Sequence, residues 1–192
     1  MTRLALILLV VAAAGACGDN VDGPLHYDDP PAGGKLRLVR DPASTPKAMV
    51  LDLVVGDAPL TGYSAGFDLP LDVTKVQLGA FTPGTALSAG TSPVAAKAVI
   101  ATTGLHANML VVGQSQKAAG QGAVTTDTAL APGTVVFSFE LDLTKPATAG
   151  VVFDGQAAGF VLPSGGLTDR AGNGVAGPAD ISVGTLISRT GG

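Results

Sequence analysis

From Lys35 onward the chain is divided into short apolar segments separated by Gly, Pro, Asn and Asp, and none of them keeps a 3.6-residue apolar period. The clearest segment is 134–143, in which apolar and polar residues alternate with a period of two. Its two predicted faces are Val135, Phe137, Phe139, Leu141 and Leu143 on one side, and Val136, Ser138, Glu140 and Asp142 on the other. This alternation predicts a strand with one face toward a core and the other mostly toward water.

Segment 48–55 repeats the pattern, with Met49, Leu51, Leu53 and Val55 on one predicted face and Asp52 on the other. Further predicted strands are 35–40, 63–69, 73–78, 97–102, 108–112, 151–153, 159–162 and 181–187. Segment 114–133 is rich in Gly, Ala, Gln and Thr and predicts a long loop with a short helical turn near 128–130. The spacing predicts an all-β domain, a two-sheet antiparallel and jelly-roll-like β-sandwich of about nine strands.

The N-terminal segment has the features of an export signal. Arg3 precedes 13 apolar residues, 4–16, which is the length of a signal-peptide core and shorter than the about 20 residues of a membrane-spanning helix. The segment ends in AGACGDN, residues 14–20, which resembles the lipobox of bacterial lipoproteins and places Cys17, the only cysteine of the chain, at the lipidated position. Ala14 stands where that motif usually has Leu, so cleavage at an ordinary small-residue site remains an alternative.

The resemblance to the lipobox implies an exported protein that Cys17 anchors to a membrane, in the outer membrane or at the cell surface, because two or more acyl chains give stable anchoring. Residues 18–34 are rich in Asp, Pro and Gly and predict an extended, solvated tether. The predicted organisation is a signal peptide over 1–17, a tether over 18–34 and one folded domain over 35–192.

Composition narrows the classes of partner and of site. After Cys17 the chain has no cysteine, so a disulfide framework or a thiolate metal site is excluded. One of the 11 basic residues, Arg3, lies in the signal, which leaves 10 basic and 15 acidic residues and a formal charge of −5. Nucleic acid is not expected as a partner, because phosphate binding needs clustered Lys and Arg.

Three separated segments resemble the cohesin family of β-sandwich modules, which hold dockerin-bearing partners. They are LDLVVGD with LTGYSAGFDL (51–57 and 60–69), PGTVVFSFEL (132–141), and LTDRAGNGV ahead of ISVG (167–175 and 181–184). The resemblance implies a jelly-roll-like sandwich that binds a protein partner on a flat sheet face and has no catalytic machinery. It does not identify the partner.

An enzyme is not expected, because acid–base and nucleophilic sites usually draw on His, Cys and paired carboxylates. The predicted domain has one histidine, His106, in a predicted hairpin where a solvent-exposed role is expected, and one glutamate, Glu140. Ser64 stands in a Gly-Tyr-Ser-Ala-Gly segment that is similar to a nucleophile elbow. That elbow needs a strand-to-helix turn, and here it would lie in a strand.

No cofactor is expected. Asp169 and Asn173 could offer oxygen ligands to Ca²⁺, but Asn173 and Gly174 favour a plain type I′ hairpin turn. A polysaccharide partner is the main alternative to a protein partner, although the chain has no Trp, and Tyr63 is the only Tyr after the tether, so a flat aromatic platform is not expected. A protein-docking face should be apolar over several hundred Å², whereas a sugar site should be a polar groove with an aromatic ring.

Overall fold

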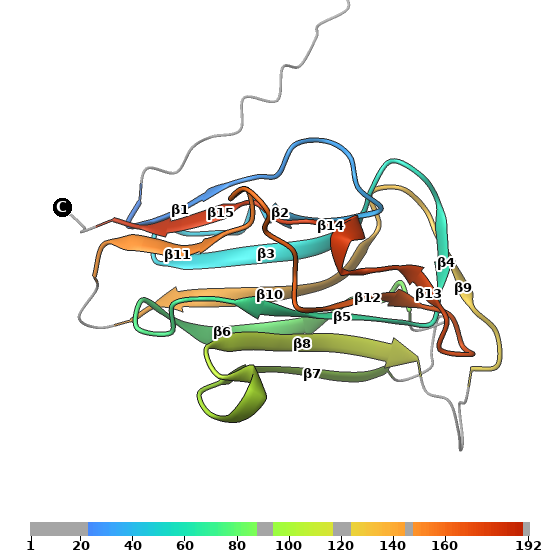
Figure 1. The fold of residues 1–192 in the computed structure, drawn as a ribbon. Coiled ribbons are helices and arrows are strands. Elements are labelled where there is room, and N and C mark those ends of the chain that lie inside the picture. Colours follow the sequence, from blue (N-terminus) through green and yellow to red (C-terminus); the bar gives the residue numbers. More distant parts are fainter. Residues whose placement is uncertain (1–22, 88–93, 117–123, 145–147, 190–192) are drawn as a thin grey trace, which may run out of the picture.

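A computed structural model describes residues 23–87, 94–116, 124–144 and 148–189, so Cys17 and the predicted signal lie outside the described residues. The protein is an all-β sandwich (Figure 1). Its strands are β1 (Leu25–Asp28), β2 (Leu36–Arg40), β3 (Ala48–Val55), β4 (Leu60–Gly62), β5 (Ser64–Pro70), β6 (Val76–Pro83), β7 (Val94–Ala101), β8 (Met109–Gln116), β9 (Thr128–Leu130), β10 (Val135–Leu143), β11 (Gly150–Asp154), β12 (Ser164–Thr168), β13 (Gly174–Ala176), β14 (Ile181–Ser182) and β15 (Thr185–Ser188). Two short 3-10 helices, η1 (Gly104–His106) and η2 (Pro178–Asp180), complete the described elements.

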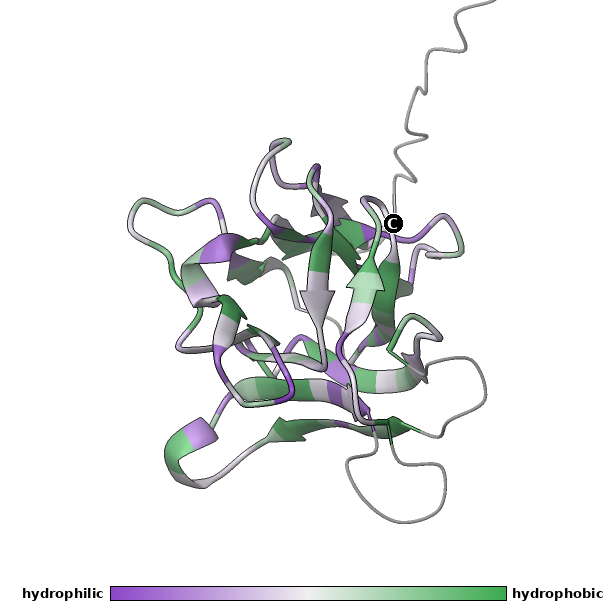
Figure 2. Ribbon diagram, turned by 90° about the vertical axis from the view of Figure 1, so that its right-hand side faces the viewer, coloured by the Kyte–Doolittle hydropathy of each residue, from purple (hydrophilic) through white to green (hydrophobic). Residues whose placement is uncertain are grey.

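Two five-stranded sheets form the sandwich. One has the order β14-β2-β3-β10-β6 and the other β13-β12-β5-β8-β7, and a three-stranded sheet β1-β15-β11 and a two-stranded sheet β4-β9 add to them. The pairs are antiparallel except β14 with β2. Phe67 of one large sheet contacts Phe137 and Phe139 of the other, with ring centroids 5.9 and 6.1 Å apart. These contacts place the hydrophobic core between the two sheets, and in Figure 2 the strands carry most of the hydrophobic colour.

The two strongest strand predictions are confirmed. β3 buries Met49, Leu51, Leu53 and Val55 on one face, as the alternation predicts. β10 likewise buries Phe137, Phe139 and Leu141 on one face. Val135 is an exception because the register shifts between it and Phe137, and a bulge of this kind turns Val135 outward and Val136 inward.

The prediction of a solvated tether through residue 34 is wrong for its second half. Residues Leu25–Asp28 form β1, which pairs with β15, and Leu25 and Tyr27 are buried. The Tyr27 hydroxyl donates a hydrogen bond to the Leu38 carbonyl oxygen at 2.8 Å and accepts one from the Gly184 N–H at 2.8 Å. The folded domain therefore begins before Leu25, and the tether of the proposed lipoprotein is shorter than predicted.

Several weaker predictions also need correction. Residues 159–162 form a loop rather than a strand, and the predicted helical turn at 128–130 is strand β9. The predicted strand 181–187 is divided into β14 and β15, while β12 falls in a glycine-rich segment for which no strand was predicted. Because some strands are divided and others are only two to four residues long, the described chain contains 15 strands rather than about nine.

Candidate functional site

The outward face of the sheet β13-β12-β5-β8-β7 carries the most distinctive surface of the described chain. Along β5, the side chains of Ala65, Phe67 and Leu69 are buried in the core. The residues between them, Ser64, Gly66 and Asp68, therefore point to the opposite face. The same alternation along β7 and β8 turns Lys97, Val99, Gly113 and Ser115 outward, and we call this surface the outer sheet face.

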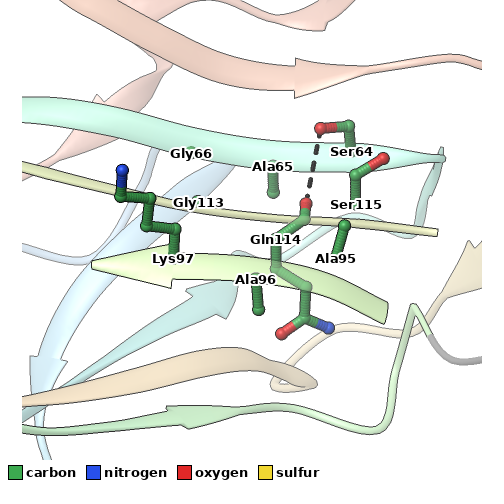
Figure 3. Close-up of a pocket in the computed structure, with 9 residues that line it drawn as sticks. All are labelled: Ser64, Ala65, Gly66, Ala95, Ala96, Lys97, Gly113, Gln114 and Ser115. Atoms are coloured by element: carbon green, nitrogen blue, oxygen red, sulfur yellow. Dashed lines mark hydrogen bonds between the residues drawn. The ribbon is translucent and has the colours of Figure 1, made fainter. Parts of the chain in front are cut away.

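A shallow groove of about 370 Å³ crosses the outer sheet face over β5, β8 and β7 (Figure 3). Gly66 pairs with Gly113, and Gly113 pairs with Lys97, so two residues without side chains and one lysine stand in register on three neighbouring strands. Figure 3 shows Lys97, Ser64 and Ser115 on the groove side of the sheet and Gln114 on the other side. The groove exists because the two glycines leave its floor empty.

Close packing of β5 against β8 explains why position 66 is a glycine. A Cβ atom there would lie 2.6 Å from the Val112 carbonyl oxygen and 2.9 Å from the Gly113 Cα atom, so a larger residue would push β5 and β8 apart. A Cβ atom on Gly113 would meet only main-chain atoms at 3.3 Å and beyond. Close strand approach explains Gly66, while Gly113 is constrained less and adds to the depth of the groove.

The side walls of the groove are formed by hydroxyl groups. The Ser64 hydroxyl donates to the Gln114 carbonyl oxygen at 3.3 Å, and the Ser115 hydroxyl donates to the Gln116 carbonyl oxygen at 3.1 Å. Each hydroxyl oxygen keeps lone-pair capacity for a ligand that donates hydrogen bonds. Lys97 is exposed and supplies donors and a positive charge.

The floor of the groove is fixed from below by a buried amide. The Gln114 side chain accepts a hydrogen bond from the Gly84 N–H at 2.9 Å and donates one to the Gly84 carbonyl oxygen at 2.7 Å. Gly84 directly follows β6 of the other large sheet, so this two-bond contact connects the sheets beneath the groove. Buried amides that satisfy both their donor and their acceptor hold one geometry.

One end of the outer sheet face holds a cluster that the sequence analysis did not anticipate. The Asp68 carboxylate accepts a hydrogen bond from the Ser164 hydroxyl at 2.8 Å and lies 2.9 Å from the His106 Nδ1 atom. The Asp68 side chain is 8% exposed and the His106 side chain 54% exposed. His106 is exposed as predicted, and η1 folds the β7–β8 connection back onto β5, which brings the histidine against one carboxylate, that of Asp68.

This cluster differs from a Ser-His-Asp triad in the order of its contacts. In a triad the histidine bridges the serine and the carboxylate, whereas here the carboxylate lies between Ser164 and His106. The Ser164 hydroxyl therefore donates directly to the Asp68 carboxylate and not to the His106 imidazole. The arrangement fixes the β7–β8 connection against β5 and β12.

The two residues considered as calcium ligands, Asp169 and Asn173, lie together, but they form hydrogen bonds with each other. The Asn173 backbone N–H and side-chain amide each donate to the Asp169 carboxylate at 2.8 Å, and the side-chain amide bond in particular lowers the pKa of Asp169. The predicted type I′ turn at Asn173 and Gly174 is wrong, because the positive φ of +85° falls on Gly172. Two backbone hydrogen bonds close the loop 170–172: the Asp169 N–H donates to the Asn173 carbonyl oxygen, and the Gly172 N–H donates to the Asp169 carbonyl oxygen. This is the pattern of a three-residue hairpin with a bulge. Within the described ranges, no group of three or more His, Cys, Asp or Glu could hold a metal ion.

The remaining candidates lie in ordinary strand positions. Ser64 begins β5, and no helix follows it as an elbow would require. Glu140 lies on β10, where a hydrogen bond with the Asp142 side chain raises its pKa. Burial raises the pKa of Asp52 on the neighbouring strand β3. Asp52, Glu140 and Asp142 share the outward side of this second sheet with Arg37, so it carries more charged residues than the outer sheet face.

Sequence reasoning missed Lys97, Gly66, Gly113 and the contact of Asp68 with His106 and Ser164. Gly66, inside the predicted strand 63–69, was an available signal, because a strand glycine often marks close backbone approach or a site where another molecule approaches. Gly113 directly follows the predicted strand 108–112 and gave no such signal. Which glycines share a register across strands could not be read from one sequence.

Comparisons with models of protein families, with curated proteins and with solved structures found no match to this chain. A search of the described part of the chain finds no helix with the length and apolar character needed to cross a membrane.

Proposed function

We propose that the protein is an exported, membrane-anchored lipoprotein whose sandwich binds a protein partner on the outer sheet face. The anchor is a lipidated Cys17, and a dockerin-like protein is the class of partner that the resemblance to cohesins implies. The proposal is supported by the signal and lipobox pattern, by the three cohesin-like segments and by the all-β sandwich that these segments imply. An enzymatic role is not proposed.

The observation that carries the docking proposal is the contrast between the two outward sheet surfaces. Among the described strand residues that point outward on the outer sheet face, the charged ones are Lys97 and Asp68, and Asp68 is occupied by Ser164 and His106. Small residues such as Ala95, Gly66 and Gly113 let a partner approach the backbone closely. A partner that presents an acidic side chain to Lys97 fits this surface, because interface charges choose partners and register more than they add affinity.

The test is recovery of the tagged, membrane-anchored protein from its native cells, with Lys97→Glu and Arg170→Glu compared in parallel. Both variants reverse one exposed charge, but Arg170 lies in the far β12–β13 hairpin rather than on the outer sheet face. We expect one stoichiometric protein partner with the unchanged chain, at least a tenfold weaker complex with Lys97→Glu, as expected for loss of about 1.4 kcal/mol, and no change with Arg170→Glu.

The anchor is tested in the same preparation by the intact mass of the recovered chain and by Cys17→Ser. A lipidated N-terminus that Cys17→Ser abolishes supports the anchor, while an unlipidated chain cut at another site contradicts it. Equal binding by Lys97→Glu and the unchanged chain contradicts docking on the outer sheet face.

Carbohydrate binding is the second candidate, and the groove itself is the observation that favours it. Its hydroxyl-lined walls and one lysine fit the donors and acceptors of a short soluble sugar, although the described lining contains no aromatic ring. Recovery of a lipidated chain without a protein partner, followed by saturable binding of an oligosaccharide that Lys97→Glu weakens, would favour this function over docking.

A further inference from the structure

We infer that the end of the sandwich where β1 begins contacts the membrane surface. The exposed tip of the β7–β8 connection is expected to touch the bilayer interface. The inference rests on the proposed lipid anchor at Cys17. It adds an interaction surface at the end of the sandwich, which adjoins the His106 end of the outer sheet face and does not include the groove.

The first argument is the length of chain between the anchor and the fold. Because β1 begins at Leu25, only seven residues, 18–24, separate Cys17 from the first strand. Seven residues reach about 25 Å when fully extended, which is about half of the roughly 50 Å that all of 18–34 would span as an extended tether. The entry end of the sandwich is therefore held close to the headgroups.

The second argument is which elements lie at that end. The Arg189 N–H donates to the Pro24 carbonyl oxygen at 2.7 Å, and the Leu25 N–H donates to the Pro46 carbonyl oxygen at 3.1 Å. At the same end, the Leu71 N–H donates a hydrogen bond to the Asn108 carbonyl oxygen at 3.0 Å, and the Asp72 N–H donates one to the Val152 carbonyl oxygen at 2.8 Å. Figure 1 shows the starts of β1 and β11 in the upper layers and the β7–β8 connection with η1 in the lowest layer, all toward the left-hand end of the strands.

The third argument is the chemistry of the exposed side chains there. Leu105, in η1, is 95% exposed, and Val151, near the start of β11, is 53% exposed. Lys47 and Arg189 are exposed beside the start of β1. Apolar side chains that enter the interfacial layer, together with basic groups near anionic lipids, are the combination that favours membrane-surface contact.

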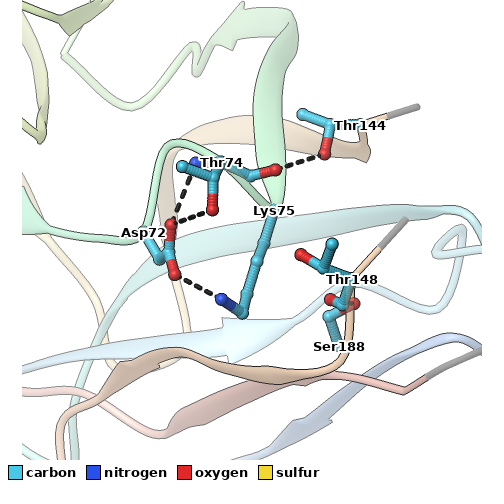
Figure 4. Close-up of polar contacts among 6 residues, drawn as sticks. All are labelled: Asp72, Thr74, Lys75, Thr144, Thr148 and Ser188. Carbon is cyan, nitrogen blue, oxygen red and sulfur yellow. Dashed lines mark hydrogen bonds and ion pairs between the residues drawn. The ribbon is translucent and has the colours of Figure 1, made fainter. Parts of the chain in front are cut away.

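A negative charge at this end is neutralised within the protein. Lys75 forms an ion pair with Asp72, and Figure 4 shows the lysine reaching the carboxylate beside Thr148 and Ser188. This pairing reduces the repulsion that a carboxylate would meet from anionic headgroups. Asp41, in the β2–β3 turn, and Asp142, opposite Ala48, also lie toward this end, so Leu105 and Val151 rather than net charge carry the expected contact with the bilayer.

The test uses tryptophan fluorescence, because the natural chain contains no Trp. Leu105→Trp places one tryptophan at the expected contact, Val151→Trp places one elsewhere on the same end, and Val135→Trp, at a 38% exposed position at the opposite end, is the matched control. Each processed, lipidated chain is reconstituted into vesicles of phosphatidylcholine and phosphatidylglycerol with and without brominated acyl chains. We expect loss of emission and a blue shift for Leu105→Trp, a smaller loss for Val151→Trp and no change for Val135→Trp.

Flotation of the unchanged chain and of Cys17→Ser with the same vesicles tests the lipid anchor separately from the contact at position 105. Failure of the unchanged chain to float overturns the anchor and, with it, this inference. Flotation without quenching at position 105, or equal quenching at positions 105 and 135, leaves the anchor standing and overturns the contact of this end with the membrane.

Discussion

At the scale of single residues, the turn that follows β5 stabilises the ionised carboxylate of Asp72. Its carboxylate accepts hydrogen bonds from the Lys75 ammonium and from the Thr74 hydroxyl and N–H, and these bonds lower its pKa from the ordinary 3.8 to about 2 (Figure 4). A carboxylate whose pKa is lower in the folded state stabilises the fold above its unfolded pKa. That stabilisation is lost as the pH falls from about 4 to about 2.

We therefore expect Asp72→Asn to lower the free energy of unfolding by about 0.5–1 kcal/mol at pH 6. The difference from the unchanged chain should shrink steadily as the pH falls toward 2, because Asp72 becomes protonated over this range and is about half protonated at its folded pKa. Urea unfolding at several pH values measures the effect. A difference that stays constant between pH 6 and pH 2 would show that the charge of Asp72 is not its cause.

Residue-level chemistry was also where the sequence was least informative. His106 and Asp68 are 38 positions apart, and nothing in the spacing indicates that η1 brings them within 2.9 Å. The groove was harder still to predict from the sequence, because its floor consists of two glycines, Gly66 and Gly113, that carry no side chain. Residue types alone therefore could not locate a surface site that depends on contacts between distant strands.

At the scale of elements, β1 is held to its neighbours in part by the hydroxyl of one side chain, Tyr27. Tyr27→Phe removes a hydroxyl that serves two main-chain partners, Leu38 and Gly184, in a buried position. Leaving a buried donor and acceptor without partners costs about 1–3 kcal/mol. We expect a loss of stability in this range, measured by thermal unfolding.

Exchange of the β1 amides is the local readout for the same variant. Faster hydrogen exchange in β1 than in β3 is expected if Tyr27 holds the N-terminal strand, whereas equal acceleration everywhere would indicate a general loss of stability. Tyr63→Phe is a comparison variant, since the Tyr63 hydroxyl donates to a single partner, the Val124 carbonyl oxygen, at 3.1 Å.

The elements that could be predicted were those whose signal is local. β3 and β10 are long and alternate cleanly, so their burial follows from their own sequences. β1 has only Leu25 and Tyr27 as buried residues in a segment rich in Asp, Pro and Gly, and its pairing partner β15 lies about 160 positions later. β12 was missed for a related reason, because Gly165 and Gly166 adopt φ values of +124° and +134° that no strand pattern reveals.

At the scale of the whole molecule, the height of the sandwich above the membrane should depend on the tether. Insertion of a flexible segment of about 20 Gly and Ser residues after Asp19 would allow an average separation of the order of 25 Å beyond the natural tether. We expect this insertion to abolish quenching of Leu105→Trp while leaving flotation intact. Quenching that survives the insertion would mean that the contact has an affinity of its own, rather than following from the short tether.

The position of β1 also determines how the molecule would carry tension. A pull on the N-terminal segment acts along the axis of β1, and the main-chain bonds between β1 and β15 are then loaded side by side, together with the two bonds of the Tyr27 hydroxyl. Bonds loaded in this way must fail together, whereas bonds that are peeled open fail one at a time. Because forced unfolding is governed by the unfolding rate, a sandwich stretched between a membrane and a partner would resist detachment through the strand nearest its anchor.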